Sequence, residues 1–367
     1  MTIVYCISSL VPPGGMQRTL TVKANYLADV AGHSVHIVIR SHGTSHFPLS
    51  PHIQVHYIKK DYRSSLTRLL FSIRPDITVS LYGEEARFLY KIDDGSKKIL
   101  EFHFTRNHLI HLVRGLPNVR FRRLRLQYVR LLQYMDERYA HHYHKLVLLT
   151  EADRALWGYP SNAVAIPNPL SFISPSTSDL SAKRILSTGR LIATKGFDLL
   201  IDAFRLVAMR HPDWRLTIFG EGQDRQFLLN KIHRYGLEDR VEILPPTTDI
   251  AAELLNCSIY AVASRYEGFG LVITEAMECG VPCVAFDCEC GPGEIINHGV
   301  DGMLVEPLHM EKFAAALLHL IEDPTLRTRL GRQAKISARR FARTVIMQQW
   351  ETLFDSLIEQ NANVHVR

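Results

Sequence analysis

The chain has 367 residues, of which 46% are hydrophobic and 22% charged, with a formal net charge of +6 at pH 7. This length exceeds one ordinary core and suits two domains, and the composition, without low-complexity tracts or internal repeats, excludes a disordered or fibrous protein. The charge is uneven, because residues 1–165 hold 22 Lys and Arg against 12 Asp and Glu, whereas the remainder holds 21 against 25. A basic first half suits phosphates, nucleic acid or an anionic membrane, and charge alone does not choose among them.

The N-terminal segment predicts neither a signal peptide nor a membrane span. No basic residue precedes the first apolar run, which is only strand-length before Pro12 and Pro13. No stretch approaches the run of about 18 apolar residues that a spanning helix needs. We therefore expect a cytoplasmic protein that meets a membrane only peripherally, at its inner face.

Apolar runs rich in branched residues alternate with amphipathic stretches in the first half, the pattern of βαβ units. A strand is predicted over 2–8, a tight turn at Gly14 and Gly15, a helix over 16–31 and a strand over 33–40. Further strands are predicted over 53–58, 77–81, 98–101 and 145–150, with a long helix over 120–142.

The composition becomes rich in Pro and Ser over 163–181, which predicts a domain linker. We place it at 166–183, after a first domain over 1–165. A second cycle follows, with strands over 184–189, 214–219, 241–244, 259–263 and 283–286 and helices over 196–209, 225–235, 271–279, 310–321 and 325–341. The second domain spans 184–342, and an amphipathic helix follows over 345–360. The predicted fold class is α/β, with two Rossmann-like doubly wound domains.

The strongest chemical signal is Glu267-Gly-Phe-Gly-Leu-Val-Ile-Thr-Glu275, in which two carboxylates flank a glycine turn and a helix start. The glycines let the backbone approach a ligand, and the free amides of the turn suit a phosphate or a sugar hydroxyl. Glu275 has two oxygens with which to accept hydrogen bonds from a ribose diol. A solvated helix face supplies such pairs by chance, so the interpretation depends on context.

A cationic loop supplies that context. In Ser187-Thr-Gly-Arg190-Leu-Ile-Ala-Thr-Lys195-Gly196 a predicted strand ends, and Arg190 and Lys195 lead into a helix N-terminus. The two cations suit a diphosphate with the helix dipole behind them, although a pair of exposed surface cations is the alternative. A diphosphate clamp and a diol clamp together indicate a nucleoside diphosphate.

These segments resemble the retaining glycosyltransferases of the GT-B fold, specifically family 4 (glycosyl transferases group 1) of the bacterial surface-polysaccharide type. The E-x7-E motif of that family matches Glu267 to Glu275, and its G-R-x4-K-G motif matches Gly189 to Gly196. Its G-x-G turn matches Gly220 to Gly222, and the glycine turn of its first domain matches Gly14-Gly15-Met-Gln-Arg18.

The resemblance implies a metal-independent hexosyltransferase without a cofactor, whose donor we expect to be a UDP-sugar, and two domains that face each other across a cleft. It implies that Arg190 and Lys195 bind the donor diphosphate, Glu275 the ribose and Glu267 the transferred sugar. The donor-binding set also includes Gly14, Gly15, Gly268, Phe269, Gly270 and Leu271. It implies a glycan or lipid-linked acceptor, no nucleic acid partner, retention of configuration, and a C-terminal helix over 343–367 that returns to the first domain. We favour front-face transfer, because Glu267 is readily explained as a ligand of sugar hydroxyls and not as a nucleophile.

The family also places a histidine of the first domain against the donor sugar. Our candidate is His103, at the end of a predicted strand in Glu101-Phe-His103-Phe-Thr-Arg-Asn-His108, and His108 is the rival. Because the chain has 18 histidines, a structural or surface role is the alternative for either.

Six cysteines invite a metal or disulfide interpretation, since four of them, Cys279, Cys283, Cys288 and Cys290, lie close together. Their spacing matches no zinc pattern, and neither a paired C-x2-C nor a D-x-D motif is present. We therefore expect reduced structural thiols and no metal site.

Other functions remain open, because a fold does not fix a function. A sugar-nucleotide epimerase would share the donor site, and a phosphorylase would need a cofactor lysine motif that we do not find. A dehydrogenase is disfavoured because Gly14-Gly15 is not G-x-G-x-x-G. A catalytically inactive partner subunit would have lost Glu275, Arg190 or Lys195, and all three are present.

A basic segment of the first half predicts contact with an anionic membrane surface. No acidic residue occurs from Phe102 to Met135. Seven arginines interleave there with apolar residues: Arg106, Arg114, Arg120, Arg122, Arg123, Arg125 and Arg130, with Leu112, Phe121, Leu124, Leu126 and Tyr128. The alternative is a solvated basic face whose apolar side lies in the core.

Overall fold

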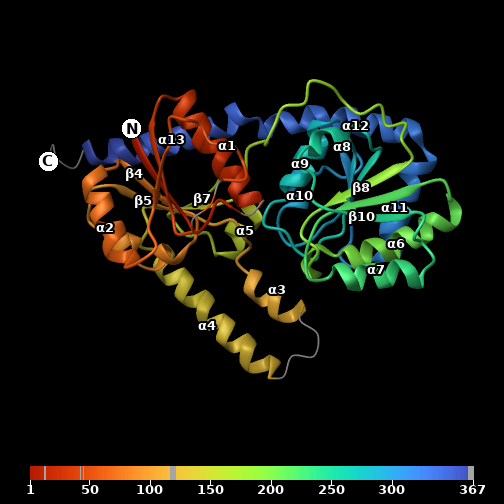
Figure 1. The fold of residues 1–367 in the computed structure, drawn as a ribbon, viewed down its shortest axis with the longest axis horizontal. Coiled ribbons are helices and arrows are strands. Elements are labelled where there is room, and N and C mark those ends of the chain that lie inside the picture. The colour runs from red at the N-terminus through yellow and green to blue at the C-terminus, as the bar shows by residue number, and fades with distance from the viewer. Residues whose placement is uncertain (12–13, 42, 44, 116–120, 363–367) are drawn as a thin grey trace. The chain divides into compact units, whose positions relative to one another are not determined.

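The computed structural model describes residues 1–11, 14–41, 43, 45–115 and 121–362. The chain divides into two compact units (Figure 1). The first unit comprises Met1–Arg106, Phe121–Ser171 and Phe341–Arg367, and the second comprises Asn107–Arg120 and Phe172–Arg340. The segment Asn107–Arg120 therefore groups with the second unit, although the sequence placed it within the first domain.

The first unit is built on a sheet of seven parallel strands in the order β3-β2-β1-β4-β5-β6-β7. The strands are β1 (Thr2–Ile7), β2 (Ser34–Ile39), β3 (Gln54–Tyr57), β4 (Ile77–Ser80), β5 (Lys97–Glu101), β6 (Lys145–Leu148) and β7 (Ala163–Ala165). The central strands β1 and β4 are buried, as expected when helices cover both faces of a parallel sheet. The strand order reverses between β1 and β4. The carboxyl ends of these two strands therefore form a switch point, the place where open α/β sheets bind ligands.

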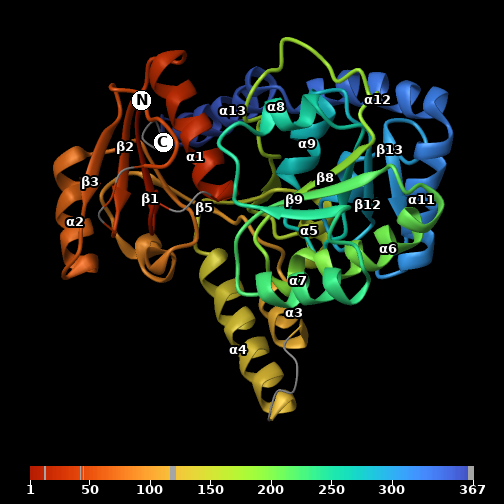
Figure 2. The ribbon, with the colours of Figure 1, turned by 45° about the vertical axis from the view of Figure 1, so that its right-hand side comes forward.

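Helices cover both faces of this sheet. They are α1 (Gly15–Asp29), α2 (Tyr62–Ile73), α4 (Arg122–Ala140), α5 (Glu151–Leu156) and α13 (Arg343–Ala362), with short 3-10 turns at Glu84–Arg87 and Leu89–Lys91. On one face α13 lies beside α1, and its Trp350 and Phe354 are buried in the same core as Ile3 and Leu20 (Figure 1). α4 runs away from the sheet of its own unit, as the turned view also shows (Figure 2).

The second unit is built on a sheet of six parallel strands in the order β10-β9-β8-β11-β12-β13. The strands are β8 (Arg184–Thr188), β9 (Arg215–Phe219), β10 (Val241–Leu244), β11 (Ile259–Val262), β12 (Cys283–Phe286) and β13 (Gly302–Val305). Because β8 pairs with both β9 and β11, the order reverses between β8 and β11, and this is the switch point of the second sheet.

The second unit also contains helices. They are α3 (His108–Gly115), α6 (Phe197–Arg210), α7 (Arg225–Arg234), α8 (Ile250–Leu255), α9 (Leu271–Glu278), α10 (Pro292–Ile295), α11 (Met310–Glu322) and α12 (Pro324–Ala338), with 3-10 turns η3 (Ala193–Lys195) and η4 (Arg339–Phe341). Of these helices, α6, α7, α11 and α12 contribute to one large core. Apolar side chains of α6 and α11 pack on the sheet, among them Phe204 and Phe313, which are fully buried.

Two doubly wound α/β units confirm the predicted fold class. Every strand predicted from periodicity is present, with ends that differ by a residue or two. The strands β7 and β13 were not predicted, because three or four residues are too few for alternation to show. Five of the described helices were not predicted either, namely α2, α3, α5, α8 and α10.

Candidate functional site

The loops that carry the predicted donor residues leave neighbouring strands at the switch point of the second sheet. β8 pairs in parallel with β11, with Ile185 opposite Ile259. Parallel strands end at the same edge of a sheet, so the loop after Thr188 and the loop after Val262 emerge side by side. The first loop carries Arg190 and Lys195, and the second carries Glu267.

Lys195 and Glu267 form an ion pair although 72 residues separate them. Nζ of Lys195 donates to Oε1 of Glu267 at 2.7 Å and to Oε2 at 2.9 Å. The hydroxyl of Ser264 donates to Oε1 at 2.6 Å. The Glu267 carboxylate is buried, whereas Lys195 remains about a quarter exposed, so the pair has a buried acceptor and a partly open donor.

Arg265 ties the two loops together. Its guanidinium donates to both carboxylate oxygens of Asp198, at 2.8 and 2.7 Å, and to the backbone carbonyl of Ala193 at 2.5 Å. Its backbone N–H donates to the carbonyl of Thr194 at 2.8 Å. Bidentate pairing fixes orientation as well as distance, so Arg265 holds the cationic loop in register with the carboxylate loop. Arg265 was not among the predicted site residues, because no local pattern links it to Asp198.

Gly196, the last residue of the cationic motif, is required by the backbone. It adopts a left-handed conformation at φ 64° and precedes the first residue of α6. A Cβ atom there would lie 1.9 Å from the carbonyl oxygen of Ala263, the residue that follows β11. The glycine therefore lets the two switch-point loops approach each other.

The carboxylate loop runs directly into the N-terminus of α9. Gly268 and Phe269 precede Gly270, which lies at φ 104°, and Leu271 is the first helical residue. The first turn of a helix leaves backbone N–H groups without helical partners, which suits an anionic or hydroxyl-rich ligand. The structure thus presents the predicted donor-binding amides at the edge where Lys195 and Glu267 meet.

Glu275 lies one turn into α9 and is only 1% exposed. Its charge acts on Tyr260 of β11, whose pKa is raised above its usual value first by burial and then by Glu275. The Tyr260 hydroxyl lies 2.6 Å from Oγ1 of Thr188, at the end of β8. Glu275 is therefore near the same two strand ends as the rest of the site, in a deeper position than Glu267.

Arg190 is exposed on the cationic loop, unlike the pairing Lys195. Its charge acts on Tyr266, whose pKa is raised by burial, with the hydrogen bond of Thr194 and the charge of Arg190 opposing that rise. An exposed guanidinium on this loop is accessible to a diphosphate.

Helix α3 packs beside this site within the second unit. The ring of His111 stacks on that of Tyr266, with centroids 4.6 Å apart. Nε2 of His111 lies 2.8 Å from Oε2 of Glu289, and the amide of Asn107 donates to Oε1 at 3.0 Å. The sequence analysis missed these residues, because Glu289 is 178 residues from His111 and no local spacing signals the contact.

The remaining candidates lie in the first unit. Gly14 is the residue before α1 and Gly15 is its first residue, so both belong to a helix N-terminus after β1, and neither has a positive φ. His103 follows β5, and its Nε2 lies 3.0 Å from Oε1 of Glu101. His108, the rival, is the buried first residue of α3 and belongs to the second unit. The two histidine candidates thus belong to different units.

All six cysteines are buried free thiols. Burial raises the pKa of Cys279 to about 11 and that of Cys283 well above its usual value. Within the ranges that the structure describes, no three His, Cys, Asp or Glu side chains gather in a way that would hold a metal ion. The crowded cysteines are therefore core residues around α9 and β12.

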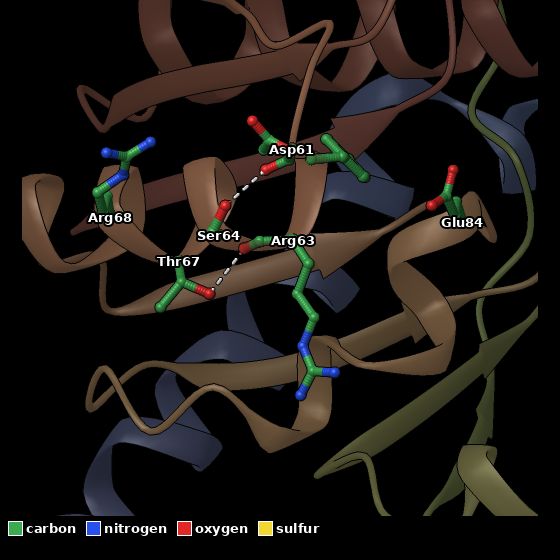
Figure 3. Close-up of a pocket in the computed structure, with 7 residues that line it drawn as sticks. Asp61, Arg63, Ser64, Thr67, Arg68 and Glu84 are labelled. Atoms are coloured by element: carbon green, nitrogen blue, oxygen red, sulfur yellow. Dashed lines mark hydrogen bonds between the residues drawn. The ribbon is translucent and has the colours of Figure 1, made fainter.

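A recess of about 840 Å³ lies elsewhere, on the first unit, lined by residues 61–64, 67, 68 and 84. It contains none of the predicted site residues (Figure 3). The hydroxyls of Ser64 and Thr67 donate to backbone carbonyls of Asp61 and Arg63, so neither is directed to a ligand. The candidate site is therefore the group of paired side chains at the switch point, because the size of a recess does not by itself indicate a function.

Comparison with known proteins adds independent information on the second unit. Residues 172–337 match the family Glycosyl transferases group 1. This range contains every predicted donor residue of the second unit.

The similar curated proteins include several glycosyltransferases. The chain is 33% identical over 211 residues to an uncharacterized glycosyltransferase of Haemophilus influenzae, covering 56% of this chain and 60% of that protein. It is 32% identical over 224 residues to the amylovoran biosynthesis glycosyltransferase AmsD of Erwinia amylovora, covering 58% and 62%. An exopolysaccharide phosphotransferase of Streptomyces coelicolor is 39% identical over 221 residues, which cover 59% of this chain and 24% of that protein. The chain spans less than two thirds of the length of these relatives.

Solved structures share the fold over nearly the whole chain. HepE of Anabaena, in complex with UDP and glucose, superimposes with a TM-score of 0.79 at 22% identity, covering 96% of this chain and 99% of that one. Sucrose-phosphate synthase of Thermosynechococcus elongatus gives a TM-score of 0.81 at 18% identity, covering 98% and 99%. The chain therefore has the GT-B fold. None of the described helices combines the length and apolarity needed to cross a bilayer.

Proposed function

We propose that this protein is a glycosyltransferase of group 1, within the retaining GT-B family 4, that transfers a hexose from a UDP-sugar to a glycan or lipid-linked acceptor. The observation that carries the proposal is the pairing of Lys195 with Glu267 at the switch point of the second sheet. It brings a cation suited to a diphosphate and a carboxylate suited to sugar hydroxyls to one place, beside the N-terminus of a helix.

Each side chain has a role in this proposal. Arg190 and Lys195 bind the diphosphate and stabilise the charge that develops on it as the sugar departs. Glu275 accepts hydrogen bonds from the ribose diol. Glu267 accepts hydrogen bonds from the transferred sugar, and His103 contacts the same sugar.

The proposed transfer proceeds at the front face of the sugar, with retention of configuration and without a metal ion or cofactor. The bond from the anomeric carbon to the diphosphate oxygen breaks, and the bond to the acceptor oxygen forms on the same face. The departing diphosphate accepts the acceptor proton, so no protein carboxylate has to act as a nucleophile. Glu267, already paired with Lys195 and Ser264, is suited to binding and not to attack.

We test the donor site by calorimetry with UDP and by a turnover assay with a panel of nucleotide sugars and lipid-linked acceptors. Glu275→Gln should lower UDP affinity, because it weakens charge-assisted hydrogen bonds worth about 1.5 to 3 kcal/mol. Glu267→Gln should spare UDP affinity and lower transfer. Glu306→Gln, an exposed carboxylate of the same unit, serves as the control.

The opposite pattern, with UDP affinity lost in Glu267→Gln and kept in Glu275→Gln, would reverse the two assignments. If neither variant changes UDP affinity or transfer, the donor does not bind at this motif. Incubation of a labelled nucleotide sugar without acceptor separates transfer from epimerisation, because an epimerase converts the sugar and leaves the diphosphate attached. An inactive subunit would bind UDP and turn over nothing.

We further propose that the protein works on an acceptor at the inner face of an anionic membrane, with α4 as the contact. Its residues Leu124, Tyr128, Leu131 and Met135 recur at helical spacing and are between 49% and 62% exposed. The opposite side of the helix, including Val129 and Gln133, is buried. The apolar residues of this helix therefore form an outward stripe and not only a core face.

Arginines flank that stripe. Arg123 and Arg130 lie on one side in the helical projection and Arg125 on the other, and all three are exposed. An apolar stripe between cations suits the boundary between acyl chains and anionic headgroups. Each cation near such a surface adds about 1 kcal/mol. Of the other predicted arginines, Arg120 and the side chains of Arg114 and Arg122 lie outside what the structure describes, and Arg106 pairs with Glu137.

A further inference from the structure

A buried chain of charged and aromatic side chains lies behind His103 in the first unit. Lys23 of α1 donates from Nζ to both carboxylate oxygens of Glu101, each at 2.5 Å. Glu101, the last residue of β5, lies 3.0 Å from Nε2 of His103, an ion-pair distance without hydrogen-bond geometry. Lys23 and Glu101 are each only 1% exposed.

Aromatic rings enclose the lysine. Its Nζ lies 4.1 Å from the centre of the Trp350 ring of α13 and 5.5 Å from that of Tyr5 on β1. A desolvated cation over an indole face gains electrostatic stabilisation. Four elements, β1, α1, β5 and α13, thus contribute to one cluster.

Glu101 carries a charge in this cluster. Burial would raise the pKa of its carboxyl group, but the charges of Lys23 and His103 outweigh burial and hold the pKa at about 2. The carboxylate is therefore ionised across the neutral range and presents negative charge to Nε2 of His103.

Stability alone does not account for this arrangement. A buried ion pair gives up the hydration of two charges, and well-packed apolar residues of similar volume are often as stable or more so. The charge lies at the carboxyl end of β5, next to the imidazole that we assign to the donor sugar. It also joins β5 to α1, the helix that begins at Gly14 and Gly15.

We propose that Lys23 and Glu101 are positioning residues of the transfer reaction. Glu101 holds the imidazole of His103 in one orientation by its contact with Nε2, and Lys23, seated on Trp350, holds Glu101. This inference rests on the proposed function, because it needs His103 to contact the sugar. Neither Lys23 nor Glu101 touches substrate.

The test compares Lys23→Met and Glu101→Gln with Lys98→Met. Lys98, which also lies on β5, forms a second buried ion pair in the same unit. Its ammonium group donates to Asp94 and Ser96 and is not part of the contact with His103. All three variants lose a buried charge, so all three should lose stability. Only Lys23→Met and Glu101→Gln should lower kcat, by up to about 100-fold, the effect of a small misplacement of a reacting group.

The affinity for UDP separates positioning from general damage. The side chains that we assign to UDP, Arg190, Lys195 and Glu275, lie on the second unit. Lys23→Met and Glu101→Gln should therefore bind UDP as wild type does while kcat falls. Trp350→Phe, which keeps an apolar ring but weakens the cation–π contact, serves as a milder variant if Lys23→Met does not fold. Its kcat should fall by less than that of Lys23→Met.

The outcomes are distinguishable. The positioning role would be overturned if the wild-type enzyme is active and the variants keep its kcat. The variants that count are Glu101→Gln and whichever of Lys23→Met and Trp350→Phe folds. That result would leave the proposed function intact. Equal losses of kcat in Lys98→Met and Lys23→Met would reduce the cluster to a stability element. A wild type that binds no UDP and transfers no sugar would remove the proposed function and this inference with it.

Discussion

At the scale of single residues, the site depends on a buried carboxylate, that of Glu267, whose charge is balanced by Lys195. Glu267 accepts hydrogen bonds from Lys195 and Ser264, so a buried carboxylate has two donors before any ligand binds. A preorganised acceptor avoids reorganisation when the sugar arrives. The serine was not part of the predicted set, yet it has a shorter contact with Glu267 than the lysine has.

Ser264→Ala should lower kcat/KM about tenfold, the equivalent of about 1.4 kcal/mol, because it removes one hydrogen bond to a charged group. Affinity for UDP should stay at the wild-type value, since the serine hydroxyl donates to Glu267, which we assign to the sugar. Ser178→Ala is the matched control, because its buried hydroxyl donates to the Cys257 carbonyl at 2.7 Å away from the site. Steady-state kinetics and calorimetry measure both effects, and a loss of UDP affinity in Ser264→Ala would contradict the assignment.

Gly196→Ala should destabilise the protein much more than Gly236→Ala. Both glycines have a left-handed φ, of 64° and 62°, so alanine brings a similar strain of about 1 to 2 kcal/mol at each. Only Gly196 has a backbone oxygen in the way, at 1.9 Å, whereas nothing lies within 4 Å of a Cβ at Gly236. Urea unfolding of the two variants measures the difference, and equal losses would show that the loops separate without cost.

Glu101 adds a prediction on acid stability. Its pKa, held at about 2, lies below the ordinary value of 4.5, so its ionised form stabilises the folded state. That stabilisation is complete above about pH 4.5 and is lost as the pH falls towards 2. The difference in unfolding free energy between wild type and Glu101→Gln should therefore shrink over this interval. A difference that stays constant from pH 6 to pH 3 would mean that the charge of Glu101 does not stabilise the fold.

At the scale of secondary-structure elements, α4 and α13 show how helices of one unit differ in role. α13 buries Trp350, Phe354 and Leu357 against the first sheet, and its position beside α1 makes it part of that core. α4 buries one side near its C-terminal end and exposes an apolar stripe along the other. An exposed apolar stripe of this kind indicates a surface that another phase or partner covers.

A triple variant, Leu124→Ser, Tyr128→Ser and Leu131→Ser, should abolish flotation with anionic liposomes at low salt. The wild type should float with anionic vesicles and much less with neutral ones, because both the arginines and the stripe contribute. Phe71→Ser, at an exposed apolar position of α2, is the control and should float as wild type does. Equal recovery with neutral and anionic vesicles would remove the membrane proposal.

At the scale of the whole molecule, two units fold around two separate sheets, and their stabilities can respond separately to a ligand. A ligand stabilises the part that binds it, by about 2.7 kcal/mol at 100 times its Kd. UDP should therefore slow amide exchange in the second unit, above all in α6 and α9, whose N-termini flank the site.

Hydrogen exchange with mass detection measures this protection by segment. The strands β2 and β3 of the first unit serve as the internal reference and should show little change. In Glu275→Gln at the same UDP concentration, protection of α6 and α9 should fall. If UDP protected only the first unit, the prediction that the nucleotide binds at the second sheet would be wrong.

The sequence by itself determined the periodic elements and the motifs. Alternating buried strands and amphipathic helices follow from local residue patterns, so the two α/β units were predictable, as was the position of Glu267 eight residues before Glu275. The residues that directly follow a predicted strand are also known from the sequence alone. Arg190, Lys195 and the glycine turn could therefore be predicted as site residues without the structure.

Only the tertiary structure decided which of these residues meet. Lys195 joins Glu267 because β8 and β11 are neighbours, and strand order is set by packing of whole elements and not by local spacing. The same holds for Arg265 with Asp198, for α3 against Tyr266, and for the chain from Trp350 through Lys23 to Glu101. Each of these contacts joins residues that are far apart in the sequence. The two side chains can pair only after the folded sheet has brought them to the same edge.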